Sequence, residues 1–143
     1  MPILNISLLS LLVAQFLKLF TKYPFDITRI IGSGGMPSSH ASFVSTLSTS
    51  IGLKYGFQSD LFAIVTVFSL IIIYDAGGVR RAVGKQANVL NKLINHLELK
   101  KTNLKKEKDL ILEDLKELIG HTPIEVFAGI LLGISIALIN NIF

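Results

Sequence analysis

The chain contains no cysteine, so it can form neither a disulfide framework nor a thiolate metal site. Its N-terminus lacks a basic n-region and an A-x-A-like cleavage site, so we interpret this segment as mature sequence rather than as a signal peptide. No internal repeat or low-complexity tract is evident. The length of 143 residues suits one domain, and we expect residues 1–143 to form a single membrane domain.

Polar residues are scarce over most of the chain. Half of it is hydrophobic (50%) and the mean hydropathy is +0.59, above that of a usual soluble domain. Uninterrupted apolar runs such as LFAIVTVFSLIIIY are shorter than the roughly 20 residues that a membrane span needs, but neutral flanking residues extend them. Four spans are therefore expected, at about residues 3–17, 39–57, 61–75 and 124–142.

The expected fold class is all-α, an integral membrane helical bundle with about four transmembrane helices. The second span is rich in Ser, Thr, Ala and Gly, small residues that allow membrane helices to pack closely. The alternative is a soluble bundle with buried helices. Four such segments in so short a chain leave little polar surface, which favours the membrane.

The basic residues predict an orientation. All 14 lysines and arginines except Lys54 lie between the first and second spans or between the third and fourth. By the positive-inside rule both of these connections are cytoplasmic and both termini lie outside. We expect a cell membrane of bacterial type, with the polar site on its cytoplasmic face.

The connection at residues 76–120 is the one sizeable polar segment, and we expect a helical loop. Apolar residues recur at helical spacing over residues 88–99 and again over residues 108–120, where Gly120 suits a C-terminal cap. These helices could lie on the membrane surface or against the bundle. A solvated helical hairpin is an equally open interpretation. No role is assigned to His96.

The stretch GGMPSSHASF, residues 34–43, combines turn residues with hydroxyls and a histidine. Pro37 suits the start of a helix, which would place Ser38 and Ser39 in its first turn. Free backbone amides and the helix dipole favour an anion there, and His40 could give a proton to a bound oxygen. A plain serine-capped helix start remains the simpler interpretation.

Further polar residues are predicted on the same membrane face. They are Lys18, Asp75, Arg80, Arg81 and His121. Cations and helix amides suit a phosphate, and two histidines suit attack and protonation of a leaving group. Charged residues at helix ends also commonly mark only the membrane interface.

Simpler roles are open for several of these residues. Glu125 and Thr122 form a capping box, so Glu125 could serve only to start the last helix. His121 could be an interfacial histidine, and Asp75 could simply pair with Arg80 or Arg81. His40, His121 and Glu125 could bind a metal, but their spacing is not a compact ligand motif, and we expect no metal site.

The motifs GGMPSSH, DAGGVRR, NKL and GHTPIEVFAG together resemble a divergent, small-membrane-protein branch of the type 2 phosphatidic acid phosphatase superfamily, which also includes vanadium haloperoxidases. The resemblance runs from about Ala14 to the C-terminus. It implies that His121 is the nucleophile that forms a phosphohistidine. It also implies that Glu125 orients this nucleophile and that His40 is the general acid.

The resemblance also implies a phosphate-binding set. Ser38 and the amides around Ser39 match the phosphate cradle, and Arg80 or Arg81 matches the third-motif arginine. Lys18 is the preferred first-motif lysine. Lys22 and Arg29, which have the Lys-x6-Arg spacing of the family without the following proline, are held second.

This sequence departs from the usual pattern of the family at three points. Ser39 replaces the glycine of P-S-G-H, Glu125 replaces an aspartate, and the arginines lie far upstream of His121 instead of a few residues before it.

The function that the resemblance implies is hydrolysis of a lipid-linked phosphate or diphosphate in the membrane. No cofactor is expected, although vanadate could mimic the phosphate, and no nucleic-acid partner is expected. The sequence leaves open whether the protein forms a homo-oligomer. The alternative is a non-catalytic protein whose anion pocket binds a lipid head group or organises a partner, and an oxidative vanadate enzyme comes third.

Overall fold

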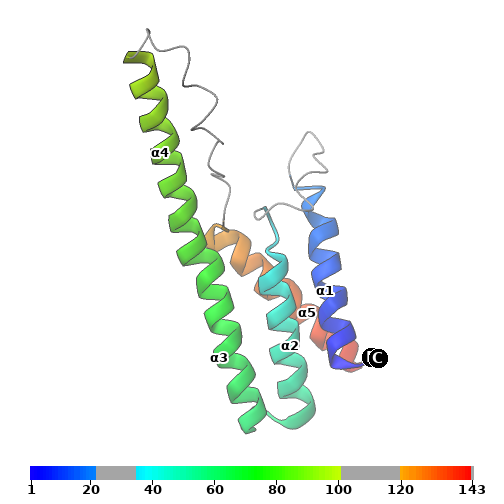
Figure 1. Ribbon diagram of the computed structural model, residues 1–143. Helices are drawn as coiled ribbons and strands as arrows, with labels where there is room; N and C mark the ends of the chain where they lie inside the picture. The colour runs from blue at the N-terminus through cyan, green and yellow to red at the C-terminus, as the bar shows by residue number, and fades with distance from the viewer. Residues whose placement is uncertain (22–34, 101–119, 143) are drawn as a thin grey trace.

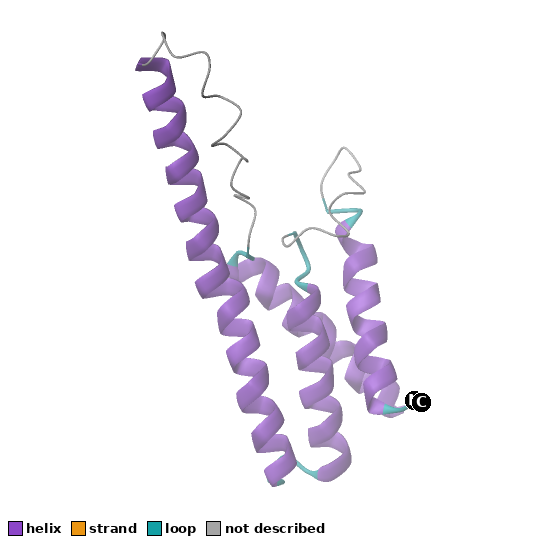
Figure 2. Cartoon of the chain, viewed as in Figure 1, coloured by secondary structure: helices purple, strands orange, loops and turns teal. Residues whose placement is uncertain are grey.

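The structure, a computed structural model, describes residues 1–21, 35–100 and 120–142 (Figure 1). The helices are α1 (Ile3–Lys18), α2 (Ser39–Tyr55), α3 (Asp60–Tyr74), α4 (Arg80–Lys100) and α5 (Pro123–Ile142). A π-helical turn, η2 (Asp75–Val79), joins α3 to α4. Every regular element in these ranges is helical (Figure 2), which confirms the all-α class. The helix expected over residues 108–120 lies almost wholly outside the described residues.

Helix α2 is the centre of the bundle. It packs against α5, α1 and α3, and α1 also contacts α5. Helices α3 and α4 form one long rod whose α4 end extends past the rest of the bundle (Figure 1).

This rod differs from the expected end of the third span near residue 75. The helix continues through η2 into α4, so the expected helix at residues 88–99 is the later part of a longer one. The physical reason is that the π-turn accommodates Gly77 and Gly78 within a continuous helical backbone, so the two glycines do not end the helix.

Burial in this bundle is the reverse of that in a soluble protein. The largest fully buried side chains are small and mostly hydroxylated: Thr46, Ser7, Ser10, Ser38, Ser39 and Ser42. Large apolar side chains lie on the surface instead, including Leu61, Ile64, Val67, Phe68 and Ile71 of α3. A soluble bundle needs those side chains inside, since its stability comes from burying them. The protein is therefore a membrane helical bundle.

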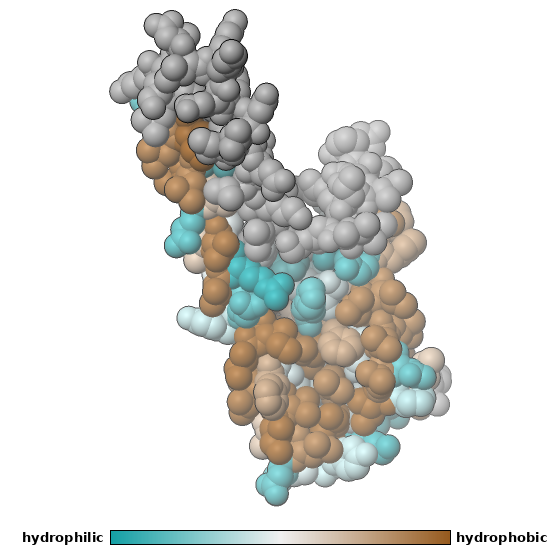
Figure 3. Space-filling view, viewed as in Figure 1, coloured by the Kyte–Doolittle hydropathy of each residue, from teal (hydrophilic) through white to brown (hydrophobic). Residues whose placement is uncertain are grey.

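Helix lengths agree with this assignment. The rod from Asp60 to Ile94 and helix α5 are long and apolar enough to cross a bilayer. Helix α1 is apolar but has only 16 residues, and the 17 residues of α2 are rich in hydroxyls. Apolar surface covers most of the lower bundle, and hydrophilic residues gather at its upper edge, where α2 and α5 begin (Figure 3).

The contact between α2 and α5 depends on two glycines of α5. A Cβ atom on Gly129 would lie 2.4 Å from the carbonyl oxygen of Ser38, and one on Gly133 would lie 2.3 Å from that of Ser42. The hydroxyl of Thr46 donates to the carbonyl of Gly133 at 3.0 Å. Small residues at four-residue spacing allow two membrane helices to approach this closely.

Hydroxyl groups also connect α2 to α3. The Ser48 and Ser69 hydroxyls lie 2.7 Å apart, and the Ser69 hydroxyl is 3.3 Å from the carbonyl oxygen of Val44. Because lipid offers no alternative partner, such bonds keep buried polar groups satisfied inside the bundle.

We predict that Gly133→Ala destabilises the protein by about 1–3 kcal/mol, the usual range for overpacking a tight contact. The added methyl group would force α2 and α5 apart. Gly78→Ala is the matched control, because its nearest neighbour is the Tyr74 ring at 3.7 Å. Thermal unfolding in detergent measures both variants, and equal midpoints would contradict the close-packing argument.

Candidate functional site

The first turns of α2 and α5 are held together at the polar end of the bundle. The backbone N–H of Ser38 donates to the carbonyl of Glu125 at 2.9 Å. Ser38 is the N-cap of α2, and its hydroxyl accepts from the Ala41 N–H at 3.4 Å. We expected Pro37 to open this helix, with Ser38 in the first turn. The helix instead begins at Ser39, because Ser38 supplies the cap.

Lys18 brings the end of α1 into the same region. Its side chain is only 4% exposed, and its Nζ donates to the Ser39 hydroxyl at 3.3 Å. The aliphatic part of the side chain lies 3.8 Å from the position that a Cβ on Gly35 would take. The charge of Lys18 lies close enough to act on Glu125. Lys22 and Arg29, the second choice for the first motif, lie outside the described residues.

Glu125 combines the two roles that the sequence left open. Its backbone N–H donates to the Thr122 hydroxyl, and its Oε2 accepts from the Thr122 N–H at 3.0 Å, which completes a capping box. The same Oε2 lies 3.2 Å from Nδ1 of His121. A carboxylate can only accept, so this contact requires the proton on Nδ1 and leaves Nε2 with a free lone pair.

The π-turn η2 fixes the backbone of His121. In an α-helix the Arg80 N–H would bond the carbonyl of Ala76, but in η2 it bonds that of Asp75. The carbonyl of Ala76 accepts from the His121 N–H at 2.9 Å instead. The π-turn therefore supplies the acceptor that fixes the histidine.

Gly120 allows the backbone before His121 to approach the α3–α4 rod closely. Its φ is +97°, and a Cβ there would lie 2.4 Å from the backbone nitrogen of Arg81. Only glycine allows both this conformation and this close approach. We had assigned Gly120 the role of a C-terminal cap, but the segment before it lies outside the described residues, and its observed contact is with the start of α4.

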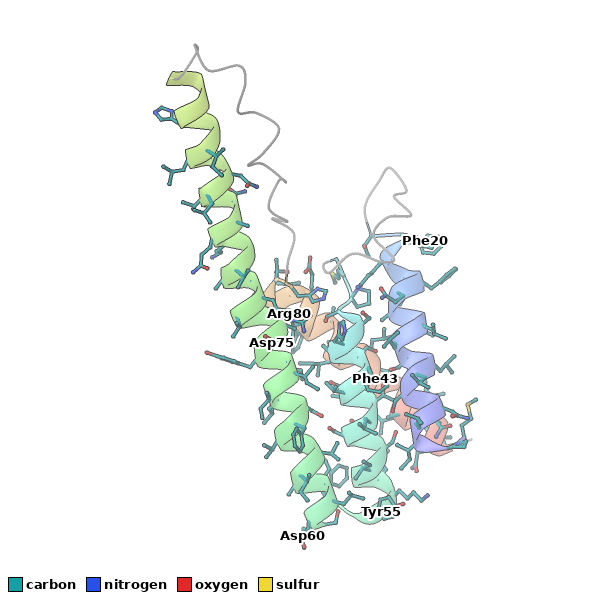
Figure 4. The ribbon with its side chains drawn as sticks, in the orientation of Figure 1. Phe20, Phe43, Tyr55, Asp60, Asp75 and Arg80 are labelled. Carbon is teal, nitrogen blue, oxygen red and sulfur yellow. The ribbon has the colours of Figure 1, made fainter. Side chains whose placement is uncertain are left out.

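Asp75 pairs with Arg80. Oδ2 of Asp75 lies 2.6 Å from Nε of Arg80, with both side chains partly exposed. Both lie on the α3–α4 rod at the level where α2 and α5 begin (Figure 4). Of the two arginines left open by the sequence, the structure selects Arg80 for this pair. No contact in the described part of the chain connects the Arg81 side chain to the other site residues.

His40 lies in the first turn of α2 and is exposed. Arg80, Lys18 and Asp75 are close enough for their charges to act on it, and His40 in turn acts on His121. The structure thus brings together groups from α1, α2, the rod and the start of α5. We call this set the polar cluster, and its members are Lys18, Ser39, His40, Asp75, Arg80, His121 and Glu125.

Within residues 1–21, 35–100 and 120–142, no three histidine, aspartate or glutamate side chains are grouped so that they could hold a metal ion.

Burial lowers the pKa of His121 below its ordinary value of 6.5. The positive charge of Lys18 acts in the same direction, whereas the bond and the charge of Glu125 oppose it. The imidazole of His121 is therefore mostly neutral at pH 7.

Several residues that build this site, or that pack α5 into the bundle below it, were not identified from the sequence. They are Ala76, Gly129, Gly133 and Ala137, of which Ala137 is 1% exposed and continues the spacing of the glycines. The pattern Gly-x3-Gly-x3-Ala in the last span is a readable signal for helix contact. No sequence signal marks the carbonyl of Ala76, because its role depends on a π-turn.

The fold and the polar cluster define a helical membrane protein with histidines, cations and carboxylates gathered at one end of its bundle. Comparison with known proteins identifies its family. A model described as the "Divergent PAP2 family" matches residues 1–136, and the chain belongs to this family. The resemblance noted in the sequence is thereby confirmed.

One curated relative is the "Uncharacterized membrane protein YuiD" of Bacillus subtilis (strain 168). It is 40% identical over 153 aligned residues, which cover 99% of this chain and 94% of that protein. No solved structure matches the chain.

We predict that His121 titrates below pH 6.5 in the folded protein. The unfolded chain takes up this proton at about pH 6.5, whereas the folded chain does so only at lower pH. The contribution of His121 to the free energy of unfolding is therefore fully present above pH 6.5. It then falls as the pH drops from 6.5 through the lowered pKa. Imidazole 15N NMR in detergent, with the pH dependence of thermal unfolding, measures both effects.

His121→Gln is the control for this experiment, since it removes one of only three histidines and so assigns the resonance. The variant should also lose this part of the pH dependence of stability. Titration of His121 at or above pH 6.5 would contradict the argument from burial.

Proposed function

We propose that the protein is a membrane phosphatase that hydrolyses a lipid-linked phosphate or diphosphate through a phosphohistidine. The observation that carries the proposal is the contact of His121 with Glu125. It leaves Nε2 of a neutral, buried imidazole free to attack, beside two cations and a second histidine. Membership of the divergent PAP2 family supports the same chemistry.

The first half-reaction transfers the phosphoryl group to the enzyme. Nε2 of His121 attacks phosphorus and forms the P–N bond, while the bond from phosphorus to the lipid oxygen breaks. The negative charge of the bound phosphate favours the protonated form of His40. In that form His40 gives its proton to the lipid oxygen as the lipid departs. Glu125 stabilises the positive charge that develops on the imidazole ring, since its carboxylate holds Nδ1.

The second half-reaction returns the enzyme to its starting state. Water attacks phosphorus, the P–N bond breaks, and phosphate leaves. His40, now neutral, accepts the proton of the attacking water, which restores its acid form. Lys18 and Arg80 stabilise the phosphoryl oxygens in both steps, because fixed cations act most strongly where charge develops.

The start of α2 supplies neutral donors for the phosphate. In the described structure, the Ser38 N–H is bonded to Glu125 and the Ala41 N–H to the Ser38 hydroxyl. The N–H groups of Ser39 and His40 occupy the first helical positions, which have no acceptor within their own helix. They point along the helix axis toward the site of the anion.

The position of the cluster favours a lipid substrate. It lies at the upper edge of the apolar surface (Figure 3), where a phosphate head group meets water while its chains stay in the bilayer. By the positive-inside rule, the distribution of the basic residues supports a cytoplasmic position for this edge.

We predict that His121→Ala abolishes both turnover and the phosphohistidine that an acid quench traps. His40→Ala should lose about 100- to 10,000-fold with a lipid substrate, yet keep much of its rate with an aryl phosphate, whose oxygen hardly needs a proton. Glu125→Gln should fall between them. Steady-state hydrolysis of phosphatidic acid, polyprenyl diphosphates and an aryl phosphate measures the series.

His96→Asn is the matched control for this series, because His96 is an exposed histidine of α4 outside the polar cluster. Equal hydrolysis by wild type and His121→Ala would refute the mechanism. Vanadate binding without any turnover across the panel would instead favour the binding of a lipid head group.

We predict that a cysteine at Lys92 is labelled only from the cytoplasmic side and a cysteine at Gln58 only from outside. Gln58 lies between α2 and α3, at the end of the bundle opposite the polar cluster, while Lys92 lies on the extended α4. The native chain has no cysteine, so labelling has no background. Labelling of Lys92→Cys by an impermeant maleimide on intact cells would reverse the orientation.

A further inference from the structure

Asp75 is the one charged member of the polar cluster that the proposed reaction leaves without a task. A carboxylate beside a phosphate site is unfavourable unless it serves another group, since like charges repel. Asp75 nevertheless lies close enough to act on His40 and makes a 2.6 Å contact with Arg80.

The contact between Asp75 and Arg80 exists because of the π-turn. Residues five apart in an α-helix lie about 140° apart around the axis and do not face each other. In η2 the Arg80 N–H bonds the carbonyl of Asp75, and the wider turn brings the two side chains to the same side. The backbone feature that fixes His121 through Ala76 therefore also sets the position of Arg80.

The atoms used in this contact leave most of the guanidinium free. Asp75 accepts from Nε, which carries one of the five N–H donors of an arginine. Nothing else in the described part of the chain accepts from Arg80, so the four N–H groups on Nη1 and Nη2 remain. These two nitrogens form the edge that binds a phosphate with two parallel hydrogen bonds.

We infer that Asp75 is a positioning residue: it holds Nε of Arg80 so that the Nη1–Nη2 edge of the guanidinium is presented to the phosphate. This inference rests on the proposed function for the identity of the anion. An arginine side chain has many rotamers, and fixing it before the anion arrives lowers the entropy cost of binding. The carboxylate of Asp75 occupies only Nε, so it takes none of the N–H groups that the phosphate would use.

The test is vanadate binding to the full-length protein in detergent, followed by titration calorimetry. Asp75→Asn should weaken the affinity about two- to fivefold, the range of a partly exposed ion pair. Asp60→Asn is the matched control, because it removes the same charge at the first residue of α3, far along the rod from the cluster. Its affinity should equal that of wild type.

Two further variants test whether Asp75 acts through Arg80. In an Arg80→Ala background, Asp75→Asn should cause no additional loss. Arg80→Lys keeps the charge and leaves Asp75 intact but has no Nε, so it should weaken vanadate binding at least as much as Asp75→Asn does. The Nε resonance of Arg80 in 15N NMR should shift in Asp75→Asn, which checks that the ion pair forms in solution.

The possible results separate this inference from the proposed function. An affinity of Asp75→Asn equal to or tighter than that of Asp60→Asn would overturn the inference and leave the phosphatase proposal standing. Vanadate binding that depends on Asp75 in a protein without turnover would overturn the phosphatase and support the inference. Where both hold, Asp75→Asn should raise KM and also lower kcat, because Arg80 binds the phosphate and stabilises the charge that develops in the transition state. Failure of wild type to bind vanadate would overturn both.

Discussion

The close crossing of α2 and α5 is the contact on which the rest of the structure depends. Gly129 and Gly133 bring the α5 backbone against the carbonyls of Ser38 and Ser42, with no room for a Cβ atom between them. The same approach places the N-terminal turns of the two helices side by side, joined by the bond from Ser38 to Glu125. The positive dipole ends of two helices then meet at one place, and such helix starts favour negative charge.

The bundle can hold a polar interior because its exterior is apolar. In lipid, large side chains gain nothing by moving inward, so close backbone packing and hydroxyl bonds stabilise the helices instead. The buried face of α2 is accordingly rich in small hydroxylated residues, and some of them bond to backbone carbonyls, as Thr46 does to Gly133. A core of this kind lets charged groups such as Lys18 gather at its end, where water and head groups are within reach.

At the site, single groups make several contacts at once. Glu125 caps α5 and holds Nδ1 of His121 with the same oxygen. The π-turn provides a carbonyl for His121 and a position for Arg80. A helix-cap motif and the motif of the family resemblance overlap in this stretch of sequence because the same Glu125 oxygen makes both contacts.

The sequence by itself determined the class of fold, the family and the identity of the polar residues, because hydropathy and short motifs are local properties. It also predicted the capping box of Glu125, whose partners are three residues apart. Tertiary structure alone decided that the third span continues as one rod, that Arg80 rather than Arg81 pairs with Asp75, and that Ala76 accepts from His121. These three features depend on a π-turn or on contacts between distant segments. A π-turn and a long-range contact leave no periodic pattern in the sequence that could predict them.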